Sequence, residues 1–420
     1  MDMLIQLLAA FALAGIAGWA GALAARELMA ARAATAGASA EQALLRERLG
    51  AVAEKRRRER EKSERTWDGF RKFVVARKVL EAKDQRSFYL SPHDGRPLPA
   101  FMPGQYLTFR LNVPGQAKPV IRCYSLSDAP RPDYFRVTIK RCGPPPNKAD
   151  APPGVSSCFF HDDIDEGDIL DVKAPGGHFY LDPEDTKPVV LIGGGIGLTP
   201  VLSMLNAIID VGARREVHFF YGLRFKAEHA MADHLRKIAA EHDNVHLHVC
   251  YSDATPEDKQ GVDYHHHERV SVELFKRVLP NGNNYDFYMC GPPPMMQSVV
   301  EQLREWGVPD ERIHFEAFGP ASVKRAAAAS PAVGGTAGLE VVFARSGKTV
   351  AWDGKATLLE TAEANGVKID FGCRAGNCGT CITAVKEGEV VYPTPPGSPP
   401  EAGSCLACIA VPKVSVKLDA

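Results

Sequence analysis

Four cysteines near the C-terminus constrain this chain more than any other feature. Cys373, Cys378 and Cys381 stand in the run FGCRAGNCGTC, and Cys408 follows in SCLACIAVP. Thiolates are soft ligands, and four of them satisfy two tetrahedral irons joined by bridging sulfides. The segment around the first three cysteines contains Gly372, Gly376 and Gly379, which allow it to fold tightly. The pattern therefore indicates a metal centre held mainly by one loop.

The C-x4-C-x2-C…C spacing is typical of plant-type [2Fe–2S] clusters. The alternative is a zinc site, but zinc sites usually consist of two separated C-x2-C pairs. A five-residue step inside a glycine-bearing loop does not fit that arrangement. We therefore predict a [2Fe–2S] cluster, a one-electron carrier. Its fourth ligand is Cys405 or Cys408.

The composition allows more than a small electron carrier. A length of 420 residues favours two to four domains, and a net charge of −1 gives no argument for nucleic-acid binding. Of the 10 cysteines, those outside the cluster are scattered without a disulfide framework, which suits a reducing compartment. Apart from the fourth-ligand candidates they are Cys123, Cys142, Cys158, Cys250 and Cys290.

The N-terminal segment is apolar. Residues 3–25 contain only Gln6 as a polar side chain, and about 23 residues of helix span roughly 35 Å. A signal peptide would have a basic start and a shorter apolar core. Here Met-Asp-Met precedes the apolar stretch, and arginines from Arg26 onward follow it. We therefore predict a single-pass transmembrane anchor in the cell membrane, with the N-terminus outside and the remaining chain cytoplasmic.

Two linkers divide the rest of the chain. Residues 26–66 are rich in helix formers and mixed charges, which predicts either a solvated helical spacer or a basic segment drawn to lipid headgroups. Residues 321–338 are mostly small and predict a flexible tether. After the anchor (1–25), the expected domains are 67–183, 184–320 and 339–420.

The first of these domains alternates short strands with turns, in FVVARKVL, SFYL, QYLTFRLNV and YFRVTIKRC, which predicts a small antiparallel β-barrel. Arg122, Tyr124 and Ser125 offer a cation for a pyrophosphate, an aromatic face and a hydroxyl, which together suit a flavin. About 30 residues later, Gly154, Val155, Ser156 and Ser157 form a glycine turn that leads into an apparent helix. The amides at the start of such a helix can hold phosphate. Either cluster alone is a weak signal.

The second domain begins with PVVLIGGGIGLTPVLSMLNAII, a buried strand, a glycine loop and an apolar helix. The loop contains Gly193, Gly194, Gly195 and Gly197, which allow a pyrophosphate to approach the backbone. Thr199 with Pro200 is expected to start the helix. The loop does not match G-x-G-x-x-G, and a plain glycine turn is the alternative. Strands in EVHFFYGLR, VHLHVCYSD and YDFYMC predict a parallel α/β domain.

Residues 67–420 resemble the ferredoxin–NADP reductase superfamily in RCYSL, PPGVSSCFF, GGGIGLTP, FYGLR, DFYMCGPPPMM and HFEAFGP. The flavin and nucleotide segments are most similar to the reductase half of flavohaemoglobins, and the domain order resembles reductase components of bacterial aromatic-ring and steroid oxygenases. The resemblance implies a multidomain α/β plus β fold with a flavin barrel, a parallel α/β nucleotide domain and a β-grasp ferredoxin domain. The anchor departs from those mostly soluble reductases.

The resemblance also implies functions for single residues. Arg122, Tyr124 and Ser125 would bind the pyrophosphate, ribityl chain and ring of FAD rather than FMN. Residues 154–157 would hold its phosphate side. In the nucleotide domain, the pyrophosphate would meet Gly194, Gly195, Gly197 and Thr199, and the nicotinamide would meet Cys290 and Gly291.

Three further assignments follow from the resemblance. Phe318 would lie near the flavin ring, with a core position as the alternative, and would complete a catalytic group with Ser125 and Cys290. No base accompanies Cys290, so it is not expected to be a nucleophile. The L-x-C context before a proline favours Cys408 as the fourth cluster ligand.

Asp253 predicts the nucleotide preference. It follows Ser252 where users of NADPH tend to carry arginine, and its carboxylate accepts from a ribose hydroxyl but repels a 2′-phosphate. We therefore expect NADH, although Asp253 could simply begin a surface turn and Arg224 could reach a phosphate. The tract of histidines 265–267 is expected to be a solvated loop, because no second ligand group accompanies it in the sequence.

The implied mechanism is hydride transfer from NADH to the flavin, followed by single electrons to the cluster. The sequence favours an NADH-dependent reductase that serves a membrane-associated acceptor such as an oxygenase, a desaturase or a quinone. The alternative is a non-catalytic membrane redox sensor or scaffold with the same cofactors.

Overall fold

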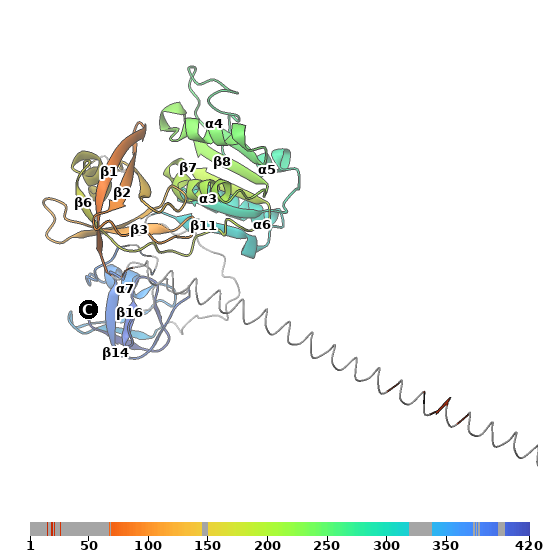
Figure 1. The fold of residues 1–420 in the computed structure, drawn as a ribbon. Coiled ribbons are helices and arrows are strands. Elements are labelled where there is room, and N and C mark those ends of the chain that lie inside the picture. The colour runs from red at the N-terminus through yellow and green to blue at the C-terminus, as the bar shows by residue number, and fades with distance from the viewer. Residues whose placement is uncertain are drawn as a thin grey trace, which may run out of the picture. The chain divides into compact units, whose positions relative to one another are not determined.

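The computed structural model describes residues 67, 69–144, 150–318, 338–372, 374, 376, 379–393 and 400–420, together with residues 15, 18, 19, 21 and 26 (Figure 1). The chain divides into two compact units, Met1–Arg65 and Thr66–Ala420. The predicted anchor and the charged linker lie almost entirely outside the described residues. Within the described part of the chain, no helix has both the length and the apolar character needed to span a membrane.

The first domain is a six-stranded antiparallel sheet in the order β4-β3-β6-β1-β2-β5. An antiparallel bridge between Leu126 and Val137 joins the two outer strands, so the sheet closes into a barrel. The elements are β1 (Arg71–Ala82), β2 (Gln85–Pro92), β3 (Tyr106–Leu111), β4 (Val120–Ser125), β5 (Phe135–Lys140), α2 (Val155–Asp162) and β6 (Ile169–Val172).

Helix α2 packs against this barrel mainly through one aromatic side chain, that of Phe160. The ring of Phe160 packs edge to face against Phe88 on β2 and Phe109 on β3, with centroids 5.1 and 5.3 Å away. It also meets Tyr124 on β4 at 5.3 Å. All of these rings except that of Tyr124 are fully buried. The contacts hold the start of α2 beside β4 and thereby bring together the two clusters that predict a flavin site.

The second domain is a five-stranded parallel sheet in the order β11-β10-β7-β8-β9. Apolar side chains of α3 and α4 pack on one face of the sheet, and those of α5 and α6 pack on the other. The elements are β7 (Val189–Gly194), η1 (Gly195–Gly197), α3 (Leu198–Asp210), β8 (Val217–Leu223), η2 (Lys226–Glu228), α4 (Ala232–Glu241), β9 (Val245–Tyr251), α5 (Val272–Val278), β10 (Asp286–Gly291), α6 (Pro293–Glu305), η3 (Asp310–Arg312) and β11 (Ile313–Ala317).

The strand order reverses between β7 and β10, since β8 and β9 extend to one side of β7 while β10 and β11 extend to the other. In open α/β sheets, ligands bind outside the carboxyl ends of the strands at such a switch point. The glycine loop after β7 and the glycine at the end of β10 both lie there. The predicted parallel α/β nucleotide domain is confirmed.

The C-terminal domain is a mixed five-stranded sheet in the order β13-β12-β18-β14-β16, with a two-stranded ribbon of β15 and β17. Helix α7 buries Leu358, Leu359 and Ala362 among the apolar side chains of this sheet. Its elements are β12 (Glu340–Phe343), β13 (Lys348–Ala351), α7 (Leu358–Ala364), β14 (Ile382–Glu387), β15 (Val390–Val391), β16 (Ser404–Leu406), β17 (Val411–Pro412) and β18 (Val416–Leu418).

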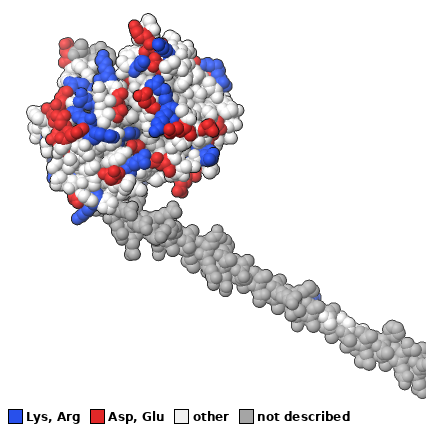
Figure 2. Space-filling view, turned by 45° about the horizontal axis from the view of Figure 1, so that its top comes forward, with Lys and Arg blue, Asp and Glu red and all other residues white. Residues whose placement is uncertain are grey.

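The surface carries both signs of charge. On the face drawn in Figure 2, lysine and arginine lie interspersed with aspartate and glutamate. Several of these side chains form ion pairs, such as Lys72 with Asp171 at 3.2 Å and Lys276 with Glu273 at 2.8 Å. This mixture agrees with the net charge of −1.

Candidate functional site

Tyr124 on β4 meets the start of α2. Its hydroxyl lies 2.7 Å from Oγ of Ser156, which places two residues predicted from separate motifs in one hydrogen bond. Burial raises the pKa of Tyr124 to about 12, against the opposing effect of that hydrogen bond. The hydroxyl of Tyr124 therefore stays protonated at neutral pH and can donate a hydrogen bond to the side chain of a flavin.

The turn before α2 is compact because it contains a glycine. Gly154 donates its N–H to the carbonyl of Cys142 at 2.9 Å, and a side chain at Gly154 would lie 2.9 Å from Cβ of Cys142. Ser157 Oγ accepts from the N–H of Cys142 and donates to the carbonyl of Gly154, both at 3.1 Å. Its hydroxyl therefore fixes the turn. No side chain caps the first turn of α2, so its N–H groups remain available to a phosphate.

Arg122 and Ser125 point in different directions from β4. Arg122 is exposed and shares a face with Tyr124, and it donates to the carbonyl of Ile121 at 2.7 Å. Successive side chains of a strand alternate between faces, so the neighbouring Ser125 does not join them. It is buried and faces the nucleotide domain. Ser125 therefore lies on the other face of β4 from Arg122 and Tyr124, and its contact with the flavin stays a prediction.

Three glycines close the switch point of the parallel sheet. A side chain at Gly197 would overlap the carbonyl of Cys290, and one at Gly194 would lie 2.8 Å from Pro292 and Met295. A side chain at Gly291 would lie 3.1 Å from Cα of Gly194. The glycines therefore allow the two loops to pack together. The fold itself requires them, in addition to any role in letting a pyrophosphate approach.

Gly195 differs from these three. Its φ is +54°, and no atom lies within 4 Å of the position that a side chain would occupy. It therefore presents open backbone to a ligand at the start of α3, where no side chain caps the helix. Thr199, predicted to face the pyrophosphate, donates its hydroxyl to the carbonyl of Ile196 at 3.1 Å and so supports the loop. Helix α3 begins one residue earlier than expected, at Leu198.

Ser125, Cys290 and Glu316 converge between the flavin and nucleotide domains. Cys290 on β10 is the direct neighbour of Glu316 on β11, and Ser125 Oγ donates to Oε2 of Glu316 at 3.5 Å. Cys290 is fully buried, and burial raises the pKa of its thiol well above the ordinary value. The thiol therefore stays protonated, in agreement with the expectation that it is not a nucleophile.

Glu316 is the residue that sequence reasoning missed. Part of the residue is accessible, but protein atoms surround its carboxyl group, and burial raises its pKa to about 8 against the opposing effect of Ser125. A perturbed carboxyl group beside predicted nicotinamide-binding residues is a candidate functional group. Phe318 follows β11 and is 37% exposed, so its core alternative does not hold.

Asp253 lies at the carboxyl end of β9, where it donates its backbone N–H to the carbonyl of Arg224 at 2.9 Å. Arg224 is ion-paired with Glu228, and its Nε donates to that carboxylate at 3.0 Å. The pKa of Arg224 is raised, first by the hydrogen bond to Glu228 and to a lesser extent by Asp253. The cation that could have held a 2′-phosphate is therefore already engaged by a carboxylate.

In the C-terminal domain the structure brings Cys381 and Cys408 together, with their Sγ atoms 3.1 Å apart. Cys373 and Cys378 lie outside the described residues. Arg374, Gly376 and Gly379 all have positive φ angles, of 52°, 73° and 74°, so the backbone between the first three cysteines turns sharply. Cys405 lies on β16 opposite Thr383, with its side chain in the apolar core. Paired sulfurs beside a tightly turned loop suit a cluster held by Cys408 rather than Cys405.

Three family models match consecutive parts of the chain. They are an oxidoreductase FAD-binding domain at residues 72–180, an oxidoreductase NAD-binding domain at 191–301 and a 2Fe-2S iron-sulfur cluster binding domain at 342–413. A flavohemoprotein of Halalkalibacterium halodurans is 42% identical over 255 residues, which are 61% of this chain and 61% of that protein. The chain thus spans less than two thirds of the length of this curated relative.

Two solved structures extend the comparison. The FAD/NAD-binding domain of nitric oxide dioxygenase from Vibrio cholerae is 34% identical with a TM-score of 0.53, covering 60% of this chain and all of that one (100%). Phthalate dioxygenase reductase is 28% identical with a TM-score of 0.50. That match covers 84% of this chain and 98% of the reductase, whose description names electron transfer from pyridine nucleotides to [2Fe–2S].

Fold, site and comparisons together define an NAD(P)H-dependent oxidoreductase of the electron-transfer class, with FAD, NADH and a [2Fe–2S] cluster as its cofactors. More specifically, the chain belongs to the ferredoxin–NADP reductase superfamily and carries a C-terminal ferredoxin domain, as phthalate dioxygenase reductase does.

The carboxyl group of Glu316 predicts a pH dependence. Its pKa of about 8 lies above the ordinary value, so it is protonated at neutral pH and ionised above pH 8. An ionised carboxylate stabilises the positive charge that nicotinamide gains on losing hydride. We expect stopped-flow bleaching of the flavin by NADH to accelerate through pH 8 in the wild type. This step should disappear in Glu316→Gln and persist in Glu301→Gln, which alters an exposed carboxylate on α6. Superimposable profiles for wild type and Glu316→Gln would contradict the assignment.

The cluster ligands are tested by three serine variants. Cys378→Ser should remove the visible [2Fe–2S] absorption and transfer to one-electron acceptors, while NADH still bleaches the flavin. Cys408→Ser should do the same, because a cluster missing one of its four thiolates is not held. Cys405→Ser should retain the cluster. Loss of the absorption in Cys405→Ser but not in Cys408→Ser would reverse the choice of the fourth ligand.

Asp253→Arg tests nucleotide preference. We expect the ratio of kcat/KM for NADH to that for NADPH to exceed one in the wild type and to fall in the variant, because an arginine there attracts the 2′-phosphate. Glu241→Arg is the matched control, since it makes the same change of charge on an exposed residue at the end of α4. A wild type that prefers NADPH would refute the prediction.

Proposed function

We propose that this reductase supplies electrons to a membrane-associated acceptor of the oxygenase type, or to a desaturase or quinone. The observation that carries the proposal is the combination of flavin, nucleotide and cluster domains in one chain, in the arrangement of phthalate dioxygenase reductase. That relative's printed name ties it to a dioxygenase, which supports an oxygenase here. The flavohemoprotein relative matches 61% of this chain, whereas phthalate dioxygenase reductase matches 84% of it.

The cofactors supply the change from a two-electron hydride donor to one-electron delivery. The chain's own residues bind and orient them. Tyr124, Ser156 and the first turn of α2 would hold the flavin, with Arg122 as the cation for its pyrophosphate. Gly195 and the start of α3 would hold the pyrophosphate of the nucleotide. Ser125, Cys290 and Glu316 would border the place where nicotinamide meets flavin.

The membrane part of the proposal rests on the sequence. The apolar residues 3–25 have the length of a single span, and the arginines that follow them favour a cytoplasmic body. Such an anchor would confine the reductase to the surface where its acceptor lies. Tethering raises the effective concentration of one partner near the other without any new contact between them.

Removal of residues 1–65 tests the anchor. We expect the shortened chain to be soluble without detergent and to keep its flavin, its cluster and its NADH–ferricyanide activity. Coupling to the natural acceptor in membranes should fall by at least about tenfold, because the effective concentration is lost. A shortened chain that still requires detergent, or that couples as well as the full chain, would contradict the proposal.

The same preparation separates a reductase from a redox sensor. A reductase turns over NADH steadily with ferricyanide or cytochrome c, whereas a sensor becomes reduced once and stops. Cross-linking of the full chain in native membranes, followed by mass spectrometry, would then identify the acceptor. Failure of steady turnover in a preparation with full flavin and cluster content would reject the enzymatic proposal.

A further inference from the structure

A file of three imidazoles, one buried and two partly buried, runs across the nucleotide domain from the start of β8. His218 Nδ1 lies 3.2 Å from His248 Nε2, and His248 Nδ1 lies 3.3 Å from His266 Nε2. At the other end of the file, His218 Nε2 lies 2.8 Å from Oε1 of Glu216. The expectation of an isolated, solvated histidine loop at 265–267 therefore fails at His266, which meets histidines of the sheet.

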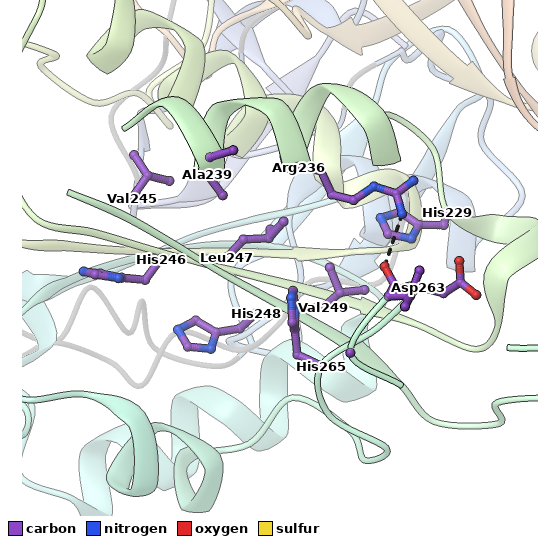
Figure 3. A pocket seen from close by; sticks show the side chains of 13 residues that line it. His229, Arg236, Ala239, Val245, His246, Leu247, His248, Val249, Asp263 and His265 are labelled. Atoms are coloured by element: carbon purple, nitrogen blue, oxygen red, sulfur yellow. Dashed lines mark hydrogen bonds between the residues drawn. The ribbon is translucent and has the colours of Figure 1, made fainter. Parts of the chain in front are cut away.

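Register explains how these side chains come together. His218 is the direct neighbour of His246 in the parallel pairing of β8 with β9, and their ring centroids lie 4.7 Å apart. Figure 3 shows His246 and His248 leaving β9 on the same side, as residues two apart in a strand must. His218, His246 and Glu216 thereby gather where β8 and β9 begin, away from the glycine loops at the carboxyl ends.

We propose that Glu216, His218 and His246 form a binding site for a divalent transition-metal ion such as Zn²⁺. One ligand atom from each residue lies within 4.8 Å of the other two. Two imidazoles and one carboxylate suit zinc and its late first-row neighbours, whereas magnesium and calcium prefer oxygen ligands alone. Three protein ligands leave a further position for water or another small ligand.

The burial of the three residues suits capture of an ion from solution. His218 is buried, Glu216 is partly buried, and His246 is exposed. Two ligands at about 2.1 Å from a tetrahedral ion lie about 3.4 Å apart. The pair of Glu216 and His218 is already closer than that. The exposed ring of His246 therefore needs only a small inward rotation to complete the site, and it leaves an entry path from solvent.

Partners outside the three ligands hold them in place. Tyr285 Oη donates to Oε1 of Glu216 at 2.9 Å, and Asn281 Nδ2 donates to Oε2 at 3.0 Å. His248 contacts the nitrogen of His218 that faces away from the carboxylate. Ligating histidines in proteins commonly have their second nitrogen fixed in this way, which orients the ring and selects its tautomer.

The file of imidazoles has two consistent arrangements of protons. When Nε2 of His218 donates to Glu216, its Nδ1 must accept from His248, which in turn accepts from His266. When Nε2 of His218 binds a metal, Nδ1 must donate, and the two following hydrogen bonds reverse. Each neutral ring keeps one proton, with one released to solvent at His218 and one taken up from solvent at His266. Metal binding thus keeps both hydrogen bonds between imidazoles and replaces only the one between His218 and Glu216.

Equilibrium dialysis of the full chain, with FAD and cluster bound, tests the site. We propose to dialyse it against Zn²⁺ with a large excess of Mg²⁺ and to measure zinc and iron by mass spectrometry. The wild type should hold about one more zinc per chain than His246→Ala, with equal iron in both. Glu216→Gln should weaken zinc binding by more than about tenfold. His267→Ala is the matched control, because it removes an exposed histidine next to the file and should bind zinc as the wild type does.

NADH–ferricyanide activity serves as the check on folding, since none of these residues belongs to the cofactor sites. All variants should keep it. If the wild type and His246→Ala hold the same amount of zinc, the proposed site is refuted. This applies both when neither protein binds zinc and when cysteines bind it in both. Loss of binding in His267→Ala as well would also overturn it, because the zinc would then be held by the exposed tract.

Discussion

The packing of the glycine loop after β7 against the end of β10 is the constraint on which the cofactor site depends. Gly197 lies so close to the carbonyl of Cys290 that no side chain fits between them. This contact joins the two strands at the reversal of the sheet, and it sets where α3 begins and where Cys290 points. Because β11 pairs with β10, the same contact also sets the position of Glu316, and through it the junction with Ser125 of the barrel.

The sequence was sufficient for the parts of this arrangement that depend on local spacing. Alternation in β1, β2, β3 and β5 predicted the barrel strands, and a buried run followed by glycines predicted β7, its loop and α3. Gly154 and its serines predicted the start of α2. In each case the signal lies within about a dozen residues, where the period of the element and the conformation of glycine are decisive.

The parts that the sequence could not give depend on long-range pairing. Ser125 and Glu316 are 191 positions apart, and a single carboxylate in HFEAFGP has no spacing that marks it. The motif of Arg122, Tyr124 and Ser125 also did not show that Ser125 lies on the other face of β4 from the first two residues, beside Glu316. The solvated loop expected at 265–267 failed at His266 because that residue contacts His248 of β9. The pairing of His218 with His246 was missed because no single-segment pattern reports a register between strands.

The cofactor site and the proposed metal site occupy opposite ends of the same strands. β8 has seven residues, so its two ends are about 20 Å apart at roughly 3.3 Å per residue. An ion at Glu216 and His218 is therefore too far away to touch a nucleotide beside Gly194. It would instead tie the starts of β8 and β9 together, and β9 is an edge strand of the sheet. A ligand that binds only the folded domain stabilises it by mass action. The consequence of such an ion would thus be a firmer sheet beneath the cofactor site rather than a change in hydride transfer itself.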